Sequence, residues 1–437
     1  MLMSFSFSNF LSFKDKETIS FETNKKSNRL SEQVLLDGNN KINKGLVCFG
    51  ANASGKTNLI RTIASIRRII ITNFKEKNKY NTFKINNNNQ ISSFEFKFSI
   101  DGEILFYEIL IDFENDIIIS EKLHNGKKHG VYFDRYYDND KIIISTSKKL
   151  SKEDKKFFDV YSMDFNTNQD DKYKSYFFLR YVAKKRSDES DYYKAYKNVF
   201  GEILKIIVIY SDTEFGGILR MLEDNNDFTR FKELLQIYKI DISDLVKEEV
   251  PMESIMPSDK DMQDNIYDLV NQLEKNDDFQ ISISGMLISF TKNNDGEIKV
   301  HKLTLRHGSD DIFEYYEESE GTRRLFDLLP LLLLPKDRDA LVLIDEIDQS
   351  LHTLLTQKLI KDLFDISHTS KYQFLITTHD VNLLNQELLR GDEILLLNKN
   401  DDTHSSSIKV FSDFKKRADR DVIERYLNGE FGAIPKF

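Results

Sequence analysis

Alternating apolar and polar positions mark the first part of the chain as rich in strands. Alternation across residues 3–21, interrupted by a charged turn at residues 14–16, predicts two antiparallel strands. It returns across residues 94–100 and 104–111, on either side of the dipeptide Asp101-Gly102. Because Asp-Gly favours the two-residue turns that join antiparallel strands, this pattern predicts a β-hairpin.

The pattern changes at about residue 151. Residues 151–275 are highly charged and place apolar side chains at helical spacing, as over residues 192–207. Strand-like segments return over residues 279–305. We therefore expect an α/β fold, in which residues 1–150 and 276–437 form one core with a mixed sheet flanked by helices, and residues 151–275 form an inserted helical lobe.

A phosphate-binding loop is predicted at residues 50–57, which read GANASGKT. An apolar run at residues 45–49 predicts a buried strand before the loop, and residues 58–70 predict a helix after it. Backbone N–H groups of such a loop, together with the helix N-terminus, hold nucleotide phosphates. Lys56 would reach the β- and γ-phosphates, and Thr57 would bind Mg²⁺. The alternative is a glycine-rich turn that carries a lysine. The predicted nucleotide-binding residues are Gly50, Asn52, Ser54, Gly55, Lys56, Thr57 and Asn58.

A second apolar run, residues 339–344, ends in two carboxylates and predicts a central parallel strand. Ligands bind at the carboxyl ends of such strands, so Asp345 is predicted to help hold Mg²⁺ and Glu346 to polarise the attacking water. The alternative is a strand followed by an acidic surface turn. A further strand over residues 372–378 ends in His379, which we expect to hydrogen-bond the γ-phosphate. Glu346, His379 and Lys56 are the predicted catalytic residues.

Composition narrows the class of protein. The formal net charge of −10 gives no global attraction to nucleic acid or to anionic membranes. A single cysteine, Cys48, excludes an internal disulfide framework and is expected to be a small core residue. The apolar segment at residues 328–335 is far shorter than the roughly 20 residues of a membrane-spanning helix. With no secretory signal recognised at the N-terminus, we expect a cytoplasmic protein.

These motifs, in this order, resemble those of ABC-class ATPases, in the cytosolic branch that includes the SMC, RecF and OLD-like types. The opening sequence NFLSFK at residues 9–14 is similar to the start of that group. Residues 318–324, ESEGTRR, resemble its signature motif, and Ser350 and Leu351 fall where its D-loop does. The closing residues 426–435 resemble those of AbiL-type and PARIS AriA-like ATPases, which act in bacterial anti-phage defence.

The resemblance implies a composite site. In that class the signature motif, here Ser319, Gly321 and Thr322, reaches the γ-phosphate of the opposite subunit, which implies a homodimer or a higher homo-oligomer with ATP and Mg²⁺ as cofactors. Its metal-contacting Q-loop glutamine is assigned here to Gln90. The signature departs from the Ser-Gly-Gly pattern of transporters. On the residues alone, the alternative is an acidic turn before a helix, with Ser319 as the helix cap.

Two classes of function remain open. In the first, the protein is an ATP-hydrolysing sensor or regulator of an effector protein, a toxin or nuclease, in anti-phage defence. In the second, it is an SMC- or RecF-like ATPase that binds DNA during repair. Basic clusters at residues 67–68, 184–186 and 415–417 could contact DNA, but such clusters are more typical of solvated surfaces. The acidic balance favours the first class, in which nucleic acid is not the principal partner.

Overall fold

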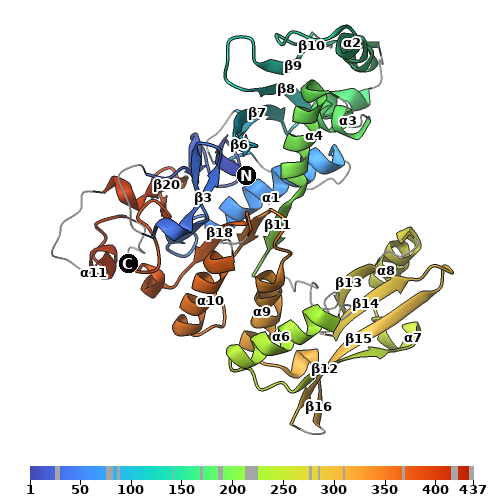
Figure 1. Ribbon diagram of the computed structural model, residues 1–437, viewed down its shortest axis with the longest axis vertical. Coiled ribbons are helices and arrows are strands. Elements are labelled where there is room, and N and C mark those ends of the chain that lie inside the picture. Colours follow the sequence, from blue (N-terminus) through green and yellow to red (C-terminus); the bar gives the residue numbers. More distant parts are fainter. Residues whose placement is uncertain are drawn as a thin grey trace. The chain divides into compact units, whose positions relative to one another are not determined.

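The computed structural model describes residues 1–24, 30–74, 82–85, 89–139, 141–167, 171–185, 190–211, 225–274, 278–283, 286–308, 311–366, 370–414 and 422–432. The chain divides into two compact units (Figure 1). The first contains residues 1–208, 336–347 and 364–437, and the second contains residues 209–335 and 348–363. The described part of the chain contains no helix with the length and apolar character needed to span a membrane. The domain boundaries expected at residues 150 and 275 stay a prediction.

A six-stranded, mostly parallel sheet forms the centre of the first unit. Its strands, in spatial order, are β11 (Ile206–Ile209), β17 (Leu341–Ile344), β18 (Gln373–Thr378), β5 (Gly45–Gly50), β19 (Ile394–Lys399) and β20 (Ser406–Val410). β17, β18, β5 and β19 run parallel, and β20 is antiparallel to β19. Every residue of β5, β17 and β18 is buried, as expected for strands covered on both faces. The predicted buried strands are therefore confirmed.

Helix α1 (Lys56–Thr72) directly follows the loop after β5. Its apolar face, which includes Leu59, Ile63, Ile66 and Ile70, is buried. The helix packs against β5 and β18 and ends at Asn73, whose left-handed backbone (φ 51°) closes its last turn. The predicted strand–loop–helix is thus present, with the loop held between two buried elements.

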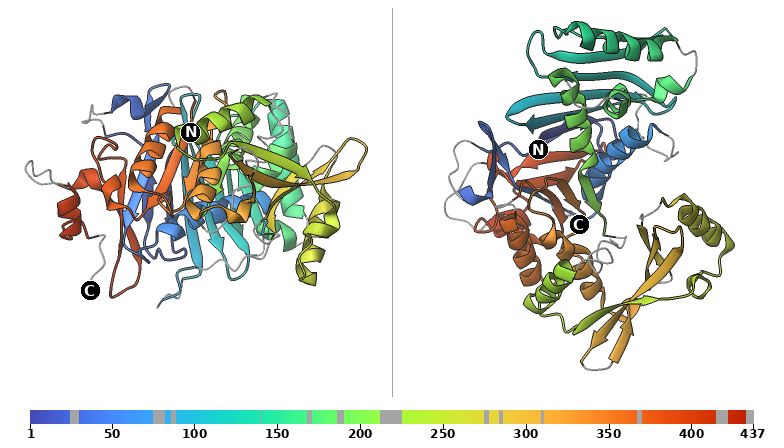
Figure 2. Two further views of the ribbon diagram at one scale, coloured as in Figure 1. Left: turned by 90° about the horizontal axis from the view of Figure 1, so that it is seen from below. Right: turned by 45° about the vertical axis from the view of Figure 1, so that its right-hand side comes forward.

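A seven-stranded antiparallel sheet is the second large sheet of the first unit (Figure 2). In spatial order its strands are β10 (Lys141–Ser145), β9 (Val131–Asp138), β8 (Ile117–His124), β7 (Glu103–Asp112), β6 (Ile91–Ile100), β1 (Leu2–Ser8) and β2 (Glu17–Ser20). The predicted pairing of β1 with β2 and the β6–β7 hairpin are confirmed. At the hairpin turn Asp101 (φ 52°) and Gly102 (φ 82°) both adopt the left-handed backbone that this turn requires.

The first unit also contains three helices that follow β10 in the chain. They are α2 (Lys152–Thr167), α3 (Phe178–Lys185) and α4 (Asp191–Leu204). Phe133 of β9 packs against Phe178 and Tyr196, with ring centroids 5.1 Å and 5.3 Å away. The helix predicted over residues 192–207 is too long, because α4 ends at Leu204 and residues 206–209 form β11 instead. The run Ile-Ile-Val-Ile is rich in β-branched residues, which favour a strand once a neighbouring strand is available.

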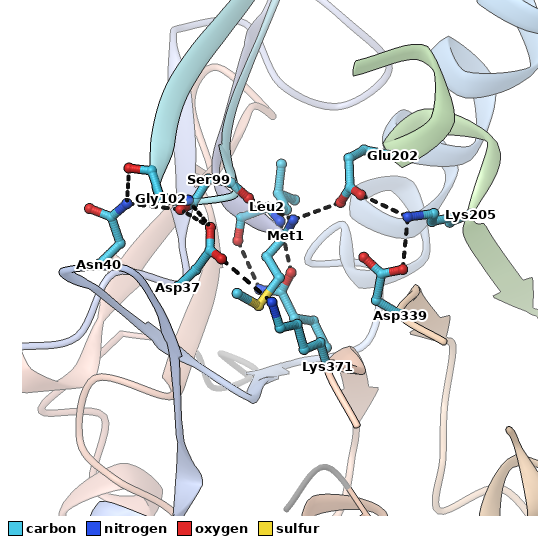
Figure 3. A network of polar contacts seen from close by, with 11 residues as sticks. Met1, Leu2, Asp37, Asn40, Ser99, Gly102, Glu202, Lys205, Asp339 and Lys371 are labelled. Carbon is cyan, nitrogen blue, oxygen red and sulfur yellow. Dashed lines mark hydrogen bonds and ion pairs between the residues drawn. The ribbon is translucent and has the colours of Figure 1, made fainter. Parts of the chain in front are cut away.

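Polar contacts tie α4 and β1 to the central sheet. Lys205 Nζ lies 3.0 Å from Glu202 Oε1 and 2.7 Å from Asp339 Oδ1, just ahead of β17 (Figure 3). The Gln373 side chain pairs with the backbone of Leu2, accepting from its N–H at 2.7 Å and donating to its carbonyl at 2.8 Å. Specific polar contacts therefore join the two large sheets of the first unit.

The second unit is built on an antiparallel sheet, in which four strands follow the order β12-β15-β14-β13 and β16 pairs with β15. Its apolar core includes Ile266, Ile283, Phe290 and Val300. The bounds are α6 (Asn225–Ile237), β12 (Asp244–Glu249), α7 (Met252–Ile255), α8 (Lys260–Gln272), β13 (Asp278–Ile283), β14 (Met286–Lys292), β15 (Ile298–His307), β16 (Asp311–Glu314) and α9 (Glu320–Leu328). Outside these sets, the α-helices and strands of the described residues are β3 (Val34–Asp37), β4 (Asn40–Asn43), α10 (Thr353–Ile366) and α11 (Val422–Leu427). Mixed α/β structure, with sheets flanked by helices, is confirmed for the whole described chain.

Candidate nucleotide site

The loop between β5 and α1 has the close packing that its two glycines predict. Gly55 adopts φ 111°, and a Cβ atom there would lie 2.4 Å from Ser406 Oγ. A Cβ atom on Gly50 would lie 2.5 Å from Ser54 Oγ and 2.9 Å from the Leu397 carbonyl oxygen. Neither position has space for a side chain, so this packing of the loop requires glycine at both.

Lys56 extends across the inside of this loop. Its side chain is 4% exposed, and Nζ donates to the carbonyl oxygens of Gly50 and Ala51 at 2.8 Å and 2.9 Å. Nζ also lies 3.3 Å from His379 Nδ1, at the end of β18. The loop carbonyls thus fix the ammonium group at the N-terminus of α1, where a bound anion is favoured.

The other predicted loop residues surround Lys56. Asn52 is exposed at the tip of the loop, whereas Ser54 is buried. Thr57 and Asn58 are half-buried in the first turn of α1, and the Asn58 carbonyl accepts a hydrogen bond from Thr62. Cys48 lies wholly buried on β5, where burial raises the pKa of its thiol, in keeping with the predicted core role.

Two serines that the sequence analysis did not single out support the loop from behind. Ser406 Oγ donates its proton to the Ser54 carbonyl at 2.7 Å, and it also lies 3.0 Å from Ser12 Oγ, which then acts as the donor. The Ser406 N–H also donates to the Ser12 carbonyl at 2.7 Å. Ser12 belongs to the NFLSFK sequence, so that motif contained a signal for this contact. Nothing in the sequence near Ser406 pointed to it.

The acidic pair follows β17 directly. Asp345 is buried, and Glu346 is half-buried with a left-handed backbone (φ 46°). Thr377 of the neighbouring strand contacts both residues, donating to Asp345 Oδ1 at 2.6 Å and accepting from the Glu346 N–H at 2.8 Å. His379 Nε2 lies 3.1 Å from Glu346 Oε1. Thr377 is a further residue that the sequence analysis missed.

The structure therefore brings Lys56, His379 and Glu346 into one hydrogen-bonded row. An ammonium group only donates, so His379 Nδ1 acts as the acceptor from Lys56. A neutral imidazole then carries its proton on Nε2, the nitrogen that faces the Glu346 carboxylate. The row joins the phosphate loop to the ends of two parallel strands, which is where α/β sheets bind ligands.

The donor atoms at this edge fit a nucleotide with a hard divalent cation. Thr57 offers a hydroxyl and Asp345 a carboxylate, which are oxygen donors of the kind that Mg²⁺ prefers. The described residues include no cluster of three or more His, Cys, Asp or Glu side chains that could hold a metal by themselves.

The predicted signature and D-loop residues lie together in the second unit. Ser319 caps α9, with Oγ accepting from the Thr322 N–H at 3.1 Å. A Cβ atom on Gly321 would lie 2.7 Å from the Ser350 carbonyl, and Ser350 Oγ donates to Glu320 at 3.0 Å. A pocket of about 350 Å³ is lined by residues that include Ser319, Gly321, Thr322, Ser350 and Leu351. The helix-cap alternative for Ser319 is therefore correct locally, and its role in a composite site stays a prediction.

Gln90 and the basic clusters have less specific surroundings. Gln90 is exposed directly before β6, and its Oε1 accepts from Thr82 Oγ1 at 3.4 Å. Its predicted contact with metal stays a prediction. Arg67 Nη2 donates to the Leu204 carbonyl at 3.2 Å, and Lys185 contacts Asp164 at 3.4 Å, so both make contacts within the protein. Arg186, residues 415–417 and residues 433–435 of the closing motif lie outside the described residues.

Comparison with known proteins places the chain in a family. A family model described as "AAA domain, putative AbiEii toxin, Type IV TA system" matches residues 47–385. The "Retron Vc95 probable ATPase" of Vibrio cholerae serotype O1 biovar El Tor is 24% identical over 399 residues, which cover 81% of this chain and 69% of the relative.

Solved structures similar to this chain include two SMC heads. One is the SmcHead bound to the C-winged helix domain of ScpA (TM-score 0.42, 14% identity, covering 93% of this chain and 96% of that one). The other is the SMC head domain from Thermotoga maritima (TM-score 0.37, 14% identity, covering 94% and 98%). Structural similarity with TM-scores and sequence identities this low does not bear on function.

Proposed function

Because the chain belongs to the family of AAA domains described as the putative AbiEii toxin of a type IV TA system, we propose that it hydrolyses ATP and regulates an effector protein in bacterial anti-phage defence. The observation that carries the enzymatic part is the row formed by Lys56, His379 and Glu346 at the mouth of the phosphate loop. A surface turn or a structural helix start would not need a lysine, a histidine and a carboxylate in contact across three elements.

Each residue of the row has a distinct role in this proposal. The loop N–H groups and Lys56 bind the phosphates, while Thr57 and Asp345 would hold Mg²⁺, which supplies charge neutralisation when it is bound. Glu346 orients and deprotonates the attacking water, because its carboxylate is half-exposed beside the loop. His379 carries a proton on Nε2 toward that carboxylate and fixes its direction.

Two observations support the defence role. The family description refers to a toxin system, and the Vibrio cholerae relative carries the name of a retron ATPase. The chain's motifs also resemble those of ABC-type defence ATPases. We therefore propose that this protein uses the same composite sites between subunits. Two copies would then form composite sites, with Ser319, Gly321 and Thr322 of one copy facing the nucleotide of the other, and an effector protein would respond to their closure.

The test uses variants that separate binding from hydrolysis. Lys56→Ala is expected to abolish nucleotide binding, since it removes the buried ammonium group. Glu346→Gln is expected to bind ATP normally and to lower hydrolysis by at least about 10²-fold, because it removes the base. Phosphate release and equilibrium binding of a fluorescent ATP analogue measure the two properties. Unchanged hydrolysis by Glu346→Gln would contradict the assignment.

The effector is sought with the same variant. Glu346→Gln is purified from its native host with ATP and Mg²⁺ present, and Lys56→Ala is the matched control that cannot bind nucleotide. A stoichiometric protein that accompanies only Glu346→Gln supports the regulatory role. Nuclease-sensitive DNA in place of a protein would support the repair-type ATPase instead.

A further inference from the structure

We propose that Thr377 is a positioning residue of the nucleotide site, whose hydroxyl holds the carboxylate of Asp345 and the backbone of Glu346 in their working orientation. This inference rests on the proposed function, because it concerns the same site. It differs in kind from the motif assignments, since Thr377 belongs to none of the motifs and contacts the acidic pair from another strand.

The sheet brings Thr377 to this place. β17 and β18 pair in parallel with Ile344 beside Ile376, so the next residue of each strand, Asp345 and Thr377, emerges at the same edge. The Thr377 side chain is wholly buried, and Oγ1 lies 2.6 Å from Asp345 Oδ1. A threonine is stiff at χ1 because Cβ is branched, so this hydroxyl is well fixed in direction.

The two hydrogen bonds of this hydroxyl have opposite senses. The Glu346 N–H must donate, so Thr377 Oγ1 accepts it at 2.8 Å and directs its own proton to Asp345 Oδ1. The hydroxyl therefore uses its proton for the bond to Asp345 and one lone pair for the bond from Glu346. Since Asp345 Oδ1 accepts this proton, the hydroxyl of Thr377 fixes the orientation of the carboxylate at that oxygen.

Thr377 also stabilises the turn that follows. Its carbonyl accepts from the Ile347 N–H at 3.0 Å, so one residue receives the N–H groups on both sides of the Glu346 carbonyl. Glu346 has a left-handed backbone (φ 46°), which a residue with a side chain adopts only where its surroundings hold it. The direction of the Glu346 side chain, 3.1 Å from His379, depends on that backbone.

The neighbouring threonine has a different task. Thr378 Oγ1 accepts from the Asp380 N–H at 3.0 Å and so shapes the turn after His379. The two consecutive hydroxyls thus serve the two sides of the site, Thr377 the acidic pair and Thr378 the histidine turn. It is the Thr377 hydroxyl that contacts the residues predicted to hold Mg²⁺ and to activate water.

Second-layer residues of this type typically change metal affinity or activity 10- to 100-fold when they are removed. Thr377→Val keeps the shape and removes the hydroxyl, and we expect it to lower kcat by roughly 10- to 100-fold and to raise the Mg²⁺ concentration needed for half-maximal activity. Nucleotide affinity measured without Mg²⁺ should stay within about twofold of wild type, because the phosphate loop is unchanged. Thr377→Ser restores the hydroxyl and should recover most of both properties.

The matched control is Thr62→Val. Thr62 is also a fully buried threonine, but its hydroxyl donates to the Asn58 carbonyl within α1. If Thr377 served only to satisfy buried polar atoms, both valine variants would lose thermal stability and neither would change Mg²⁺ dependence. A Thr377→Val protein with wild-type kcat and Mg²⁺ dependence, or a serine variant as impaired as the valine variant, overturns the proposal.

The readout does not depend on turnover alone. The gain in affinity for a fluorescent ATP analogue on adding Mg²⁺ is measured for all variants, and Thr377→Val should lose most of that gain. If wild type bound nucleotide without hydrolysing it, the proposed function would fail while this measurement still tested Thr377. Should Thr377→Val not fold, Thr377→Cys, which offers only a weak donor, has to show the same direction of change.

Discussion

At the scale of single residues, the site depends on hydrogen bonds whose donors and acceptors are fixed by chemistry. Lys56 can only donate, which sets the direction of its contact with His379 and so the position of the imidazole proton. Ser406 acts in a similar way on the loop, since the Ser54 carbonyl can only accept and therefore takes the single proton of Ser406 Oγ. The His379 imidazole and the backbone of the loop are therefore oriented by the hydrogen bonds of their neighbours.

Removing the Ser406 hydroxyl should loosen the loop without affecting the chemistry. A neutral hydrogen bond contributes about 1 kcal/mol, so Ser406→Ala is expected to weaken nucleotide binding by roughly fivefold with little change in kcat. Equilibrium titration with a fluorescent ATP analogue and steady-state kinetics measure the two quantities. Ser407→Ala, at the next position of β20, is the control, and equal weakening by both variants would show that Ser406 has no special role.

At the scale of elements, short sequence patterns predicted the helices, strands and turns that depend mainly on neighbouring residues. The Asp101-Gly102 hairpin, the buried strands and the helix after the phosphate loop each follow from a short pattern, and each is confirmed. Contacts between distant segments left no such pattern. Thr377 lies 32 residues from Asp345, and Ser406 lies 352 residues from Ser54. β11 was mistaken for the end of a helix because its strand character depends on a neighbouring strand far away in the sequence.

Glu393 directly precedes the first residue of β19. It illustrates the energetic cost of burying a carboxyl group at the start of a strand. Its side chain is wholly buried, and this burial raises the pKa of the carboxyl well above its ordinary value, although the Arg390 N–H donates to it at 2.8 Å. The folded protein therefore holds this proton more tightly than the unfolded chain. The stability contributed by the protonated group is fully present below the ordinary pKa and is lost as pH rises toward the raised one.

The glutamine variant should remove this pH dependence. Glu393→Gln has nearly the same shape and stays neutral, so its stability relative to wild type is expected to increase with pH above about 4.5, by up to about 1.4 kcal/mol per pH unit over that window. Urea unfolding at pH 5 and pH 8 measures the difference. A constant difference between the two proteins at both pH values would show that the carboxyl is not protonated in the folded state.

At the scale of the whole molecule, the unresolved question is whether the second unit acts on a nucleotide bound by another copy. Ser319, Gly321 and Ser350 form one compact surface next to a pocket, as a shared site would require. A helix cap beside a turn would make the same contacts without a partner subunit. The two arrangements differ between subunits, where a site formed in trans combines residues from two chains.

Mixing two inactive proteins separates these possibilities. Lys56→Ala disables the phosphate loop, and Ser319→Arg places a bulky cation on the signature surface while leaving the loop intact. If the signature acts in trans, each mixed dimer contains one site with a wild-type loop and a wild-type signature. An equimolar mixture would then recover about a quarter of wild-type hydrolysis, because half of the dimers are mixed and each has one intact site of two. If Ser319 acts only within its own chain, every site carries a defect and the mixture stays as inactive as its components.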